Sequence, residues 1–281
     1  MGTNEDRPFS LEANTDEHEP EQPQTPTGGT GHVAVRNLET QKRRRKAAAF
    51  LLLGDALQLL LFGALALSIH IHPLLPIDVV ITRSFQQNQA PWLRISMLVI
   101  SYPGSSFLLP TLVLLSVAIF WSLGDRLEAV FVAGLSACSL LLNFLLKVLV
   151  HRPRPSGGLV HIIVKSAGYS FPSGHVMAYI AYWGLLFAFG VILFQGRHWW
   201  RSTLLVTSAA FVVLVGPSRI YLGDHWASDV IGAYLIGGVL WGLAVGLYLP
   251  LKERGVLQTP RALARMREKK SLRSFPTKRW F

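Results

Sequence analysis

The chain has 281 residues, of which 51% are hydrophobic, and its mean hydropathy is +0.36. This composition argues against a soluble domain. The net charge of +11 could indicate a nucleic-acid partner, but most Lys and Arg residues flank apolar segments, where membrane topology accounts for them. We therefore predict a membrane protein that has no nucleic-acid partner.

Six apolar segments follow one another along the chain, and they predict an all-α polytopic protein with a bundle of six transmembrane helices. Most are close to the ~20 residues that a helix needs to cross the bilayer core. The second and fifth are shorter, which predicts a tilt or an extension into their flanks. Residues 92–100 are apolar enough for a short interfacial helix. The six segments are 47–69, 106–121, 127–149, 175–194, 203–215 and 230–249.

Two tails flank the predicted membrane domain, which comprises residues 47–249. Residues 1–46 are rich in Glu, Asp, Pro, Thr and Gly, which predicts disorder, and they end in a basic cluster at 42–46. Residues 250–281 are also basic. Because basic segments stay on the cytoplasmic side, we predict that both termini are cytoplasmic. The first apolar segment is long and distant from the N-terminus, so it predicts a retained anchor rather than a cleaved signal peptide.

The turn between the last two apolar segments contains polar residues that are costly to hold at a membrane boundary. Asp224 can cap a helix that begins at His225, and Asp229 then lies one turn further along the same face. A carboxylate there can accept the proton of the His225 Nδ1 and leave Nε2 free as a nucleophile or base. Arg219 offers a planar guanidinium suited to phosphate. A His-Asp pair alone is more often structural than catalytic, so the rest of the chain must decide.

Two further polar motifs occur at the ends of apolar segments. Lys147 and Arg154 follow the third segment, although a lysine there can simply extend its ammonium to the interface. Ser173 is a good N-cap for the fourth helix, and Gly174 and His175 fall in its first turn. Free N–H groups at a helix start can bind an anion. An ordinary capped membrane helix explains the second motif equally well.

The predicted topology brings all three motifs to the outer face of the membrane. Together they supply three cations, a helix N-terminus, two histidines and one orienting carboxylate, without a cluster of metal ligands. This combination predicts a phosphate-binding site with a nucleophile and an acid.

The three motifs resemble the signature of the type-2 phosphatidic acid phosphatase superfamily. They read K-x6-RP (Lys147, Arg154, Pro155), PSGH (ending at His175) and SR-x5-H-x3-D (Ser218 to Asp229). The family includes membrane lipid-phosphate phosphatases, soluble bacterial acid phosphatases and vanadium haloperoxidases. The resemblance extends over about residues 47–249 and leaves the tails outside.

The resemblance implies a site and a mechanism. Catalysis would fall to His225 as nucleophile, His175 as acid and base, and Asp229 as partner of the imidazole. The phosphate would be bound by Lys147, Arg154, Ser173, Gly174 and Arg219. No metal or other cofactor is implied.

The substrate that the resemblance implies is a lipid phosphate such as phosphatidate, diacylglycerol pyrophosphate, phosphatidylglycerophosphate or a polyprenyl pyrophosphate. The short loops are similar to bacterial members, so we expect the bacterial inner membrane, with the site at its outer face. A phosphotransferase with the same intermediate and a non-catalytic membrane relative remain open, and a haloperoxidase is disfavoured. The sequence does not settle the oligomeric state.

Overall fold

The computed structural model describes residues 29–194, 196 and 198–259. The chain divides into two units, residues 1–46 and 47–281. The first helix, α1 (Gly29–Ile71), begins in the first unit, so residues 29–46 of the tail predicted to be disordered are helical. Residues 1–28 of that tail, and residues 260–281 of the predicted basic tail, lie outside the described residues.

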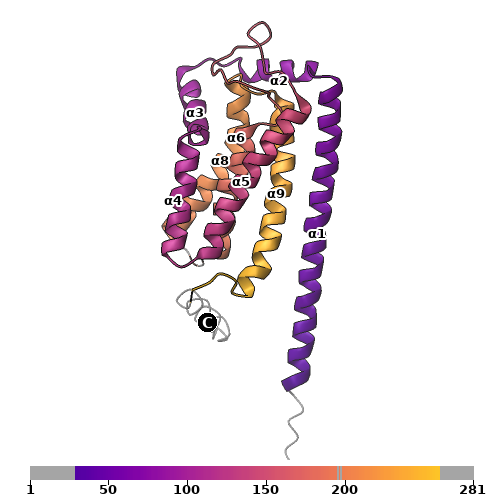
Figure 1. The fold of residues 1–281 in the computed structure, drawn as a ribbon, viewed down its shortest axis with the longest axis vertical. Coiled ribbons are helices and arrows are strands. Elements are labelled where there is room, and N and C mark those ends of the chain that lie inside the picture. Colours follow the sequence, from indigo (N-terminus) through magenta and orange to yellow (C-terminus); the bar gives the residue numbers. More distant parts are fainter. Residues whose placement is uncertain (1–28, 195, 197, 260–281) are drawn as a thin grey trace, which may run out of the picture. The chain divides into compact units, whose positions relative to one another are not determined.

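The second unit contains the apolar helices that the hydropathy pattern predicts (Figure 1). Within the described residues, 5 helices are long and apolar enough to cross a membrane, and a bent pair makes up to 6. The five are α1 from Ala49, α5 (Arg126–Val150), the continuous run of α6 (Gly174–Tyr179), the π-helical turn η2 (Ile180–Gly184) and α7 (Leu185–Ile192), then α8 (Trp199–Tyr221) and α9 (Ala227–Glu253).

The second predicted span differs most from expectation. Its core is α4 (Leu108–Ser122), and the predicted interfacial helix is α3 (Pro91–Ser101). A 3-10 turn, η1 (Tyr102–Gly104), joins them, and α3 with α4 forms a pair bent by 51° that is long enough to span together. A short helix, α2 (Pro76–Phe85), precedes them. The fifth span extends into both flanks, as its shortness predicts, and α8 therefore carries Arg219 in its last turn.

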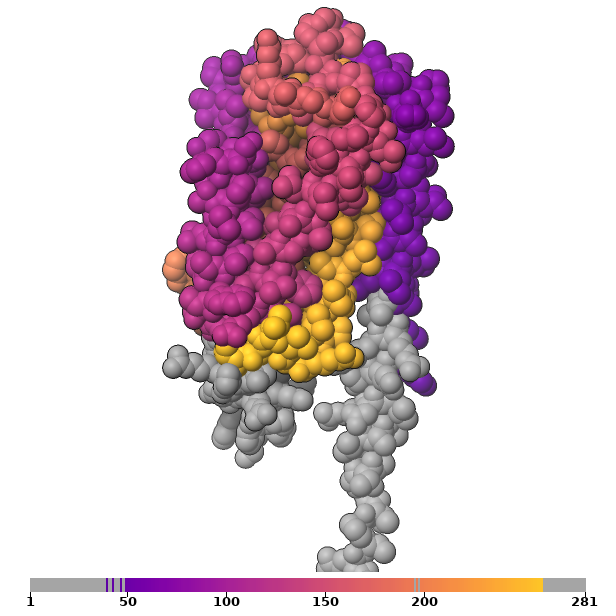
Figure 2. Space-filling model, in the orientation of Figure 1, coloured from indigo at the N-terminus to yellow at the C-terminus, as the bar shows by residue number. Residues whose placement is uncertain are grey.

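The α6–η2–α7 run is the most buried of the candidate spans. Its last helix, α7, is apolar on every side, as expected of a helix surrounded by others. Helix α9 approaches it closely at Gly237, where a Cβ would lie 2.8 Å from Ile180 Cδ1. In Figure 2 α4 and α5 form much of the front surface, and a depression between them shows orange residues of the later helices behind.

One end of the helices collects all the polar motifs. Helix α5 ends there, α6 begins there, α8 ends there and α9 begins there, beneath the loop of residues 151–173 and beside α2 (Figure 1). At the opposite end, buried Glu128 of α5 accepts hydrogen bonds from Tyr248 and Lys252 of α9. The chain therefore separates a structural ion pair at one end from the candidate site at the other.

Candidate active site

The turn between α8 and α9 holds His225 and both of its carboxylate neighbours. Helix α9 begins at Ala227 with Trp226 as its N-cap, so the predicted capping role of Asp224 is wrong. Asp229 caps the helix instead, because its Oδ2 accepts a hydrogen bond of 2.9 Å from the backbone N–H of Trp226. The same carboxylate oxygen lies 3.5 Å from Nδ1 of His225. The cap thus fixes Asp229 beside the imidazole even though His225 precedes the helix.

Burial controls the protonation state of His225. The side chain is 2% exposed and that of Asp229 is 0% exposed. Burial lowers the pKa of His225, and the nearby Asp229 and Asp224 only partly offset that decrease. A neutral imidazole, which can act as a nucleophile, is therefore favoured at neutral pH.

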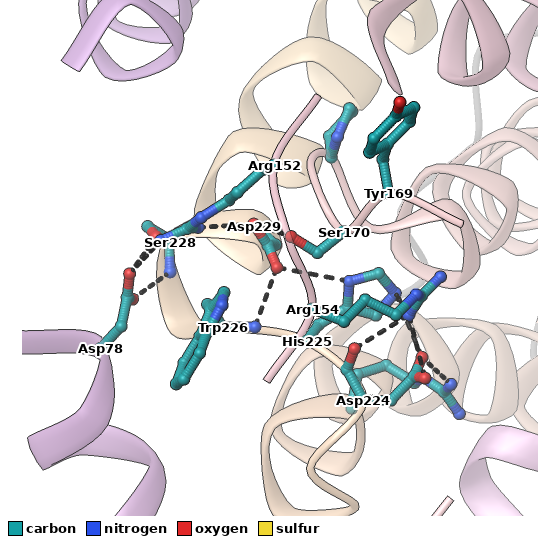
Figure 3. Close-up of polar contacts among 12 residues, drawn as sticks. Asp78, Arg152, Arg154, Tyr169, Ser170, Asp224, His225, Trp226, Ser228 and Asp229 are labelled. Atoms are coloured by element: carbon teal, nitrogen blue, oxygen red, sulfur yellow. Dashed lines mark hydrogen bonds and ion pairs between the residues drawn. The ribbon is translucent and has the colours of Figure 1, made fainter. Parts of the chain in front are cut away.

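Two arginines contact Asp224 on the other side of His225, and Figure 3 shows one of them, Arg154, next to both Asp224 and His225. Nη1 of Arg154 lies 2.9 Å from Oδ1 of Asp224 and 3.5 Å from Nε2 of His225. Arg219 forms an ion pair with Oδ2 of Asp224 and donates a hydrogen bond to the hydroxyl of Ser101. Burial would raise the pKa of Asp224, but His225, Arg219 and Arg154 together lower it below its usual range.

The start of α6 lies against Asp229, as the predicted convergence requires. The N–H of Ser173 donates to the backbone carbonyl of Asp229 at 3.2 Å. Ser173 occupies the predicted N-cap position before Gly174, but its hydroxyl makes no capping hydrogen bond. That oxygen is buried and has no hydrogen-bond partner among the described residues.

His175 and Lys147 lie near this cluster, and within the described part of the chain neither forms a hydrogen bond or ion pair with its carboxylates. His175 is half-buried, and the backbone at Gly104 packs against its ring. Lys147 is half-buried and donates to the carbonyl of Tyr169, within the electrostatic range of Arg154.

A second, buried layer of charge, which the sequence did not predict, lies behind Asp229. Arg152, which is 0% exposed, donates to Oδ1 of Asp229 at 2.6 Å and to Oδ2 of Asp78 at 2.6 Å. It also donates to the hydroxyl of Ser228 at 2.7 Å. Asp78 in turn accepts hydrogen bonds from the N–H and hydroxyl of Ser228. The only sequence signal was a second arginine in the HRPRP motif, and spacing could not show which arginine faces inward.

Two polar side chains that were also missed hold the loop before α6. Asn143 of α5 donates to the carbonyl of Pro172 at 3.0 Å. The hydroxyl of Ser170 lies 3.0 Å from the carbonyl of Pro153 and 3.4 Å from Oδ1 of Asp229. These contacts tie the three motifs together through neighbours that no single motif contains.

Comparison with known proteins identifies relatives of this arrangement. A family model described as PAP2 superfamily matches residues 127–252. The chain is 34% identical over 193 residues to phosphatidylglycerophosphatase B of Bacillus subtilis (strain 168), covering 66% of this chain and 91% of that protein. It is 27% identical over 132 residues to an undecaprenyl-diphosphatase of the same organism, covering 46% of this chain and 62% of that protein.

A solved structure has the same fold. It is the crystal structure of a transmembrane PAP2-type phosphatidylglycerolphosphate phosphatase from Bacillus subtilis, with a TM-score of 0.60 and 28% identity. The match covers 69% of this chain and 94% of that one.

Proposed function

Because the chain belongs to the PAP2 superfamily, we propose that it is an integral membrane lipid-phosphate phosphatase acting on phosphomonoester or pyrophosphate lipids. The observation that carries the proposal is the pairing of buried His225 with Asp229, beside the guanidinium of Arg154. Phosphoryl transfer requires a positioned nucleophile next to cations that stabilise the charge on the phosphoryl oxygens.

The geometry supports a reaction in two steps. Nε2 of His225 attacks phosphorus, the bond to the leaving oxygen breaks, and His175 in its protonated form donates a proton to that oxygen. Asp229 stabilises the positive charge that develops on the phosphorylated imidazole. Neutral His175 then takes a proton from water, the water oxygen attacks phosphorus, and the P–N bond breaks to release inorganic phosphate.

The phosphoryl oxygens would be held by Arg154, Arg219 and Lys147 together with the Ser173 hydroxyl and the Gly174 N–H. The buried hydroxyl of Ser173, which has no hydrogen-bond partner among the residues that the structure describes, supports this assignment because it has a proton to donate. These cations supply the charge stabilisation that a metal ion gives in other phosphatases, so we propose a metal-independent reaction.

The position of the site supports an amphiphilic substrate. A site at the end of membrane helices can take a phosphate headgroup while the lipid tail stays in the bilayer. The relatives named above act on phosphatidylglycerophosphate and on undecaprenyl diphosphate, and we propose a lipid of one of these two kinds. We place the site at the outer face of a bacterial inner membrane, because basic residues concentrate at the opposite end.

The test is phosphate release by the purified protein in detergent with a chelator present, across a panel of lipid mono- and diphosphates. We expect release by the wild type and its loss in His225→Ala. His161→Ala is the matched control, because the His161 side chain is exposed on the outer loop. Activity that disappears with the chelator and returns with magnesium would contradict the mechanism. Release only in the presence of an acceptor alcohol would identify a transferase.

A further inference from the structure

Asp224 occupies the space between the groups to which the proposed function assigns the phosphate. Its side chain is 2% exposed, and its two oxygens contact Arg219 and Arg154, the second of which Figure 3 labels beside it. Oδ2 also lies 3.2 Å from Nε2 of His225, the atom that must attack phosphorus. One carboxylate therefore contacts two of the phosphate-binding cations and the nucleophile together.

These contacts are incompatible with a phosphoryl group bound at the same atoms. A phosphate dianion next to an ionised carboxylate is repelled, and the two anions would share the same N–H donors. A carboxylate beside Nε2 also favours a proton on that nitrogen, whereas attack on phosphorus requires its lone pair. Either Asp224 leaves these atoms when phosphate binds, or phosphate binds elsewhere.

The surrounding contacts allow the Asp224 carboxylate to move away while the main chain and the two arginines keep their positions. The Asp224 main chain is held at both ends, since its N–H donates to the Arg219 carbonyl and its own carbonyl accepts from Arg154. Arg154 also donates to the carbonyl of Gly168 at 3.1 Å, and Arg219 donates to the hydroxyl of Ser101. Rotation of the Asp224 side chain would remove its carboxylate from both guanidinium groups, and their other hydrogen bonds would hold them in place.

We propose that Asp224 is an internal anion that competes with the phosphoryl group for Arg154, Arg219 and Nε2 of His225. This inference rests on the proposed function and deepens it. Substrate must displace the carboxylate before His225 can attack. After hydrolysis the carboxylate returns to the arginines and displaces inorganic phosphate, which keeps inhibition by the product weak.

Competition has a signature that direct binding lacks. The free-energy cost of displacing Asp224 is the same for every anion that binds. A neutral residue at this position should therefore raise the affinity for each anion by a similar factor. For Asp224→Asn we expect the inhibition constants of inorganic phosphate and orthovanadate to fall together, by about tenfold. The KM for lipid phosphate should fall as well. A residue that merely positions the arginines would give the opposite result, weaker binding of every anion.

The experiment measures phosphate and vanadate binding to the purified protein in detergent, both as inhibition constants and as anion-dependent shifts of the melting temperature. The melting-temperature shift requires no turnover. It therefore reports anion binding even if the assay with His225→Ala contradicts the proposed phosphatase function. Asp224→Glu keeps the charge and should stay near the wild type. If Asp224→Asn is too unstable to purify, Asp224→Ser supplies a second neutral side chain. Unchanged or weaker anion binding in the neutral variants would overturn the proposal.

Discussion

At the scale of single residues, His225 is held between carboxylates on both of its ring nitrogens. Asp229 faces Nδ1 and Asp224 faces Nε2. The first contact is supported by the helix cap at Trp226 and by Arg152, whereas the second belongs to a carboxylate that also pairs with Arg219, one of the residues proposed to bind phosphate. The contact with Asp229 is therefore fixed by its surroundings, whereas the proposed competition requires the contact with Asp224 to break when phosphate binds.

This environment predicts a shift of the acid limb of the pH profile. Burial lowers the pKa of His225 although Asp229 and Asp224 act to raise it, while Arg154 adds to the decrease. In the proposed mechanism only the neutral imidazole attacks phosphorus, so kcat/KM should stay at its plateau at pH values below the ordinary histidine pKa of about 6.5. Asp224→Asn removes one group that raises the pKa, so its acid limb should move to still lower pH. Wild type and Asp224→Asn are measured with the same substrate, so the ionisation of the substrate affects both profiles equally. An acid limb of Asp224→Asn at higher pH than that of the wild type would contradict this account.

The sequence predicted that the three motifs converge, but it predicted few of the contacts that join them. The pairing of His225 with Asp229 is local, because a spacing of four residues near a helix start constrains both side chains. The link from Arg152 to Asp78 joins residues 74 positions apart, and no periodicity along the chain reports it. Asp224 was assigned to a cap because short-range rules favour Asp there, but contact with two distant arginines determines its position instead.

At the scale of elements, α9 is the platform on which the motifs assemble. Its first turn carries Asp229, and one turn further on Gly232 leaves room for the ring of Phe171. Phe171 is 0% exposed and directly precedes the Pro172–His175 motif. The absence of a side chain at Gly232 thus positions the start of α6 against Asp229.

Gly232→Ala should therefore impair both stability and activity. A Cβ at this position would lie 2.4 Å from Cε2 of Phe171, and a rigid ring packed in a core cannot move aside cheaply. We expect a loss of about 1–3 kcal/mol in stability and a lower kcat, since the residues after Phe171 shift. Gly246→Ala on the same helix is the control, because a Cβ there would have no atom of the described residues within 4 Å, apart from the nearby helix backbone. Melting temperature and kcat are compared for the pair, and equal behaviour of the two variants would argue against this role of Gly232.

Helix α2 contributes to the site through Asp78, which contacts the buried guanidinium of Arg152. Asp78→Asn leaves that charge with Asp229 as its remaining carboxylate partner. Breaking a buried pair in this way costs about 3 kcal/mol, so the melting temperature should fall. We also expect kcat to fall more than KM rises, because Arg152 positions Asp229 rather than the substrate. Thr82→Val on the same helix removes a buried hydroxyl that has no partner in the described residues and should leave both quantities near the wild type.

At the scale of the whole molecule, hydropathy predicted the number and order of the apolar helices but not all of their ends. Lengths of apolar runs report burial in lipid, which ends where the bilayer ends, whereas α8 continues to Tyr221 through Ser218 and Arg219 because other helices surround that turn. The bend between α3 and α4 was missed for a related reason. Residues 101–105 are polar or Pro-Gly and lie where the backbone at Gly104 packs against His175. They therefore interrupt the apolar pattern between α3 and α4, which together form one bent span.

Orientation in the membrane is the prediction that charge alone supports, and it can be tested with cysteine labelling. Cys138 is the single cysteine and lies within α5, so Cys138→Ala gives a clean background. Ser156→Cys places a thiol on the exposed loop at the site end, and Arg254→Cys places one just beyond α9 at the other end. With the site outside, a membrane-impermeant maleimide should label Ser156→Cys in intact cells and Arg254→Cys only after the membrane is disrupted. The reverse pattern would place the site in the cytoplasm, where the lipid headgroups it meets are those of the inner leaflet.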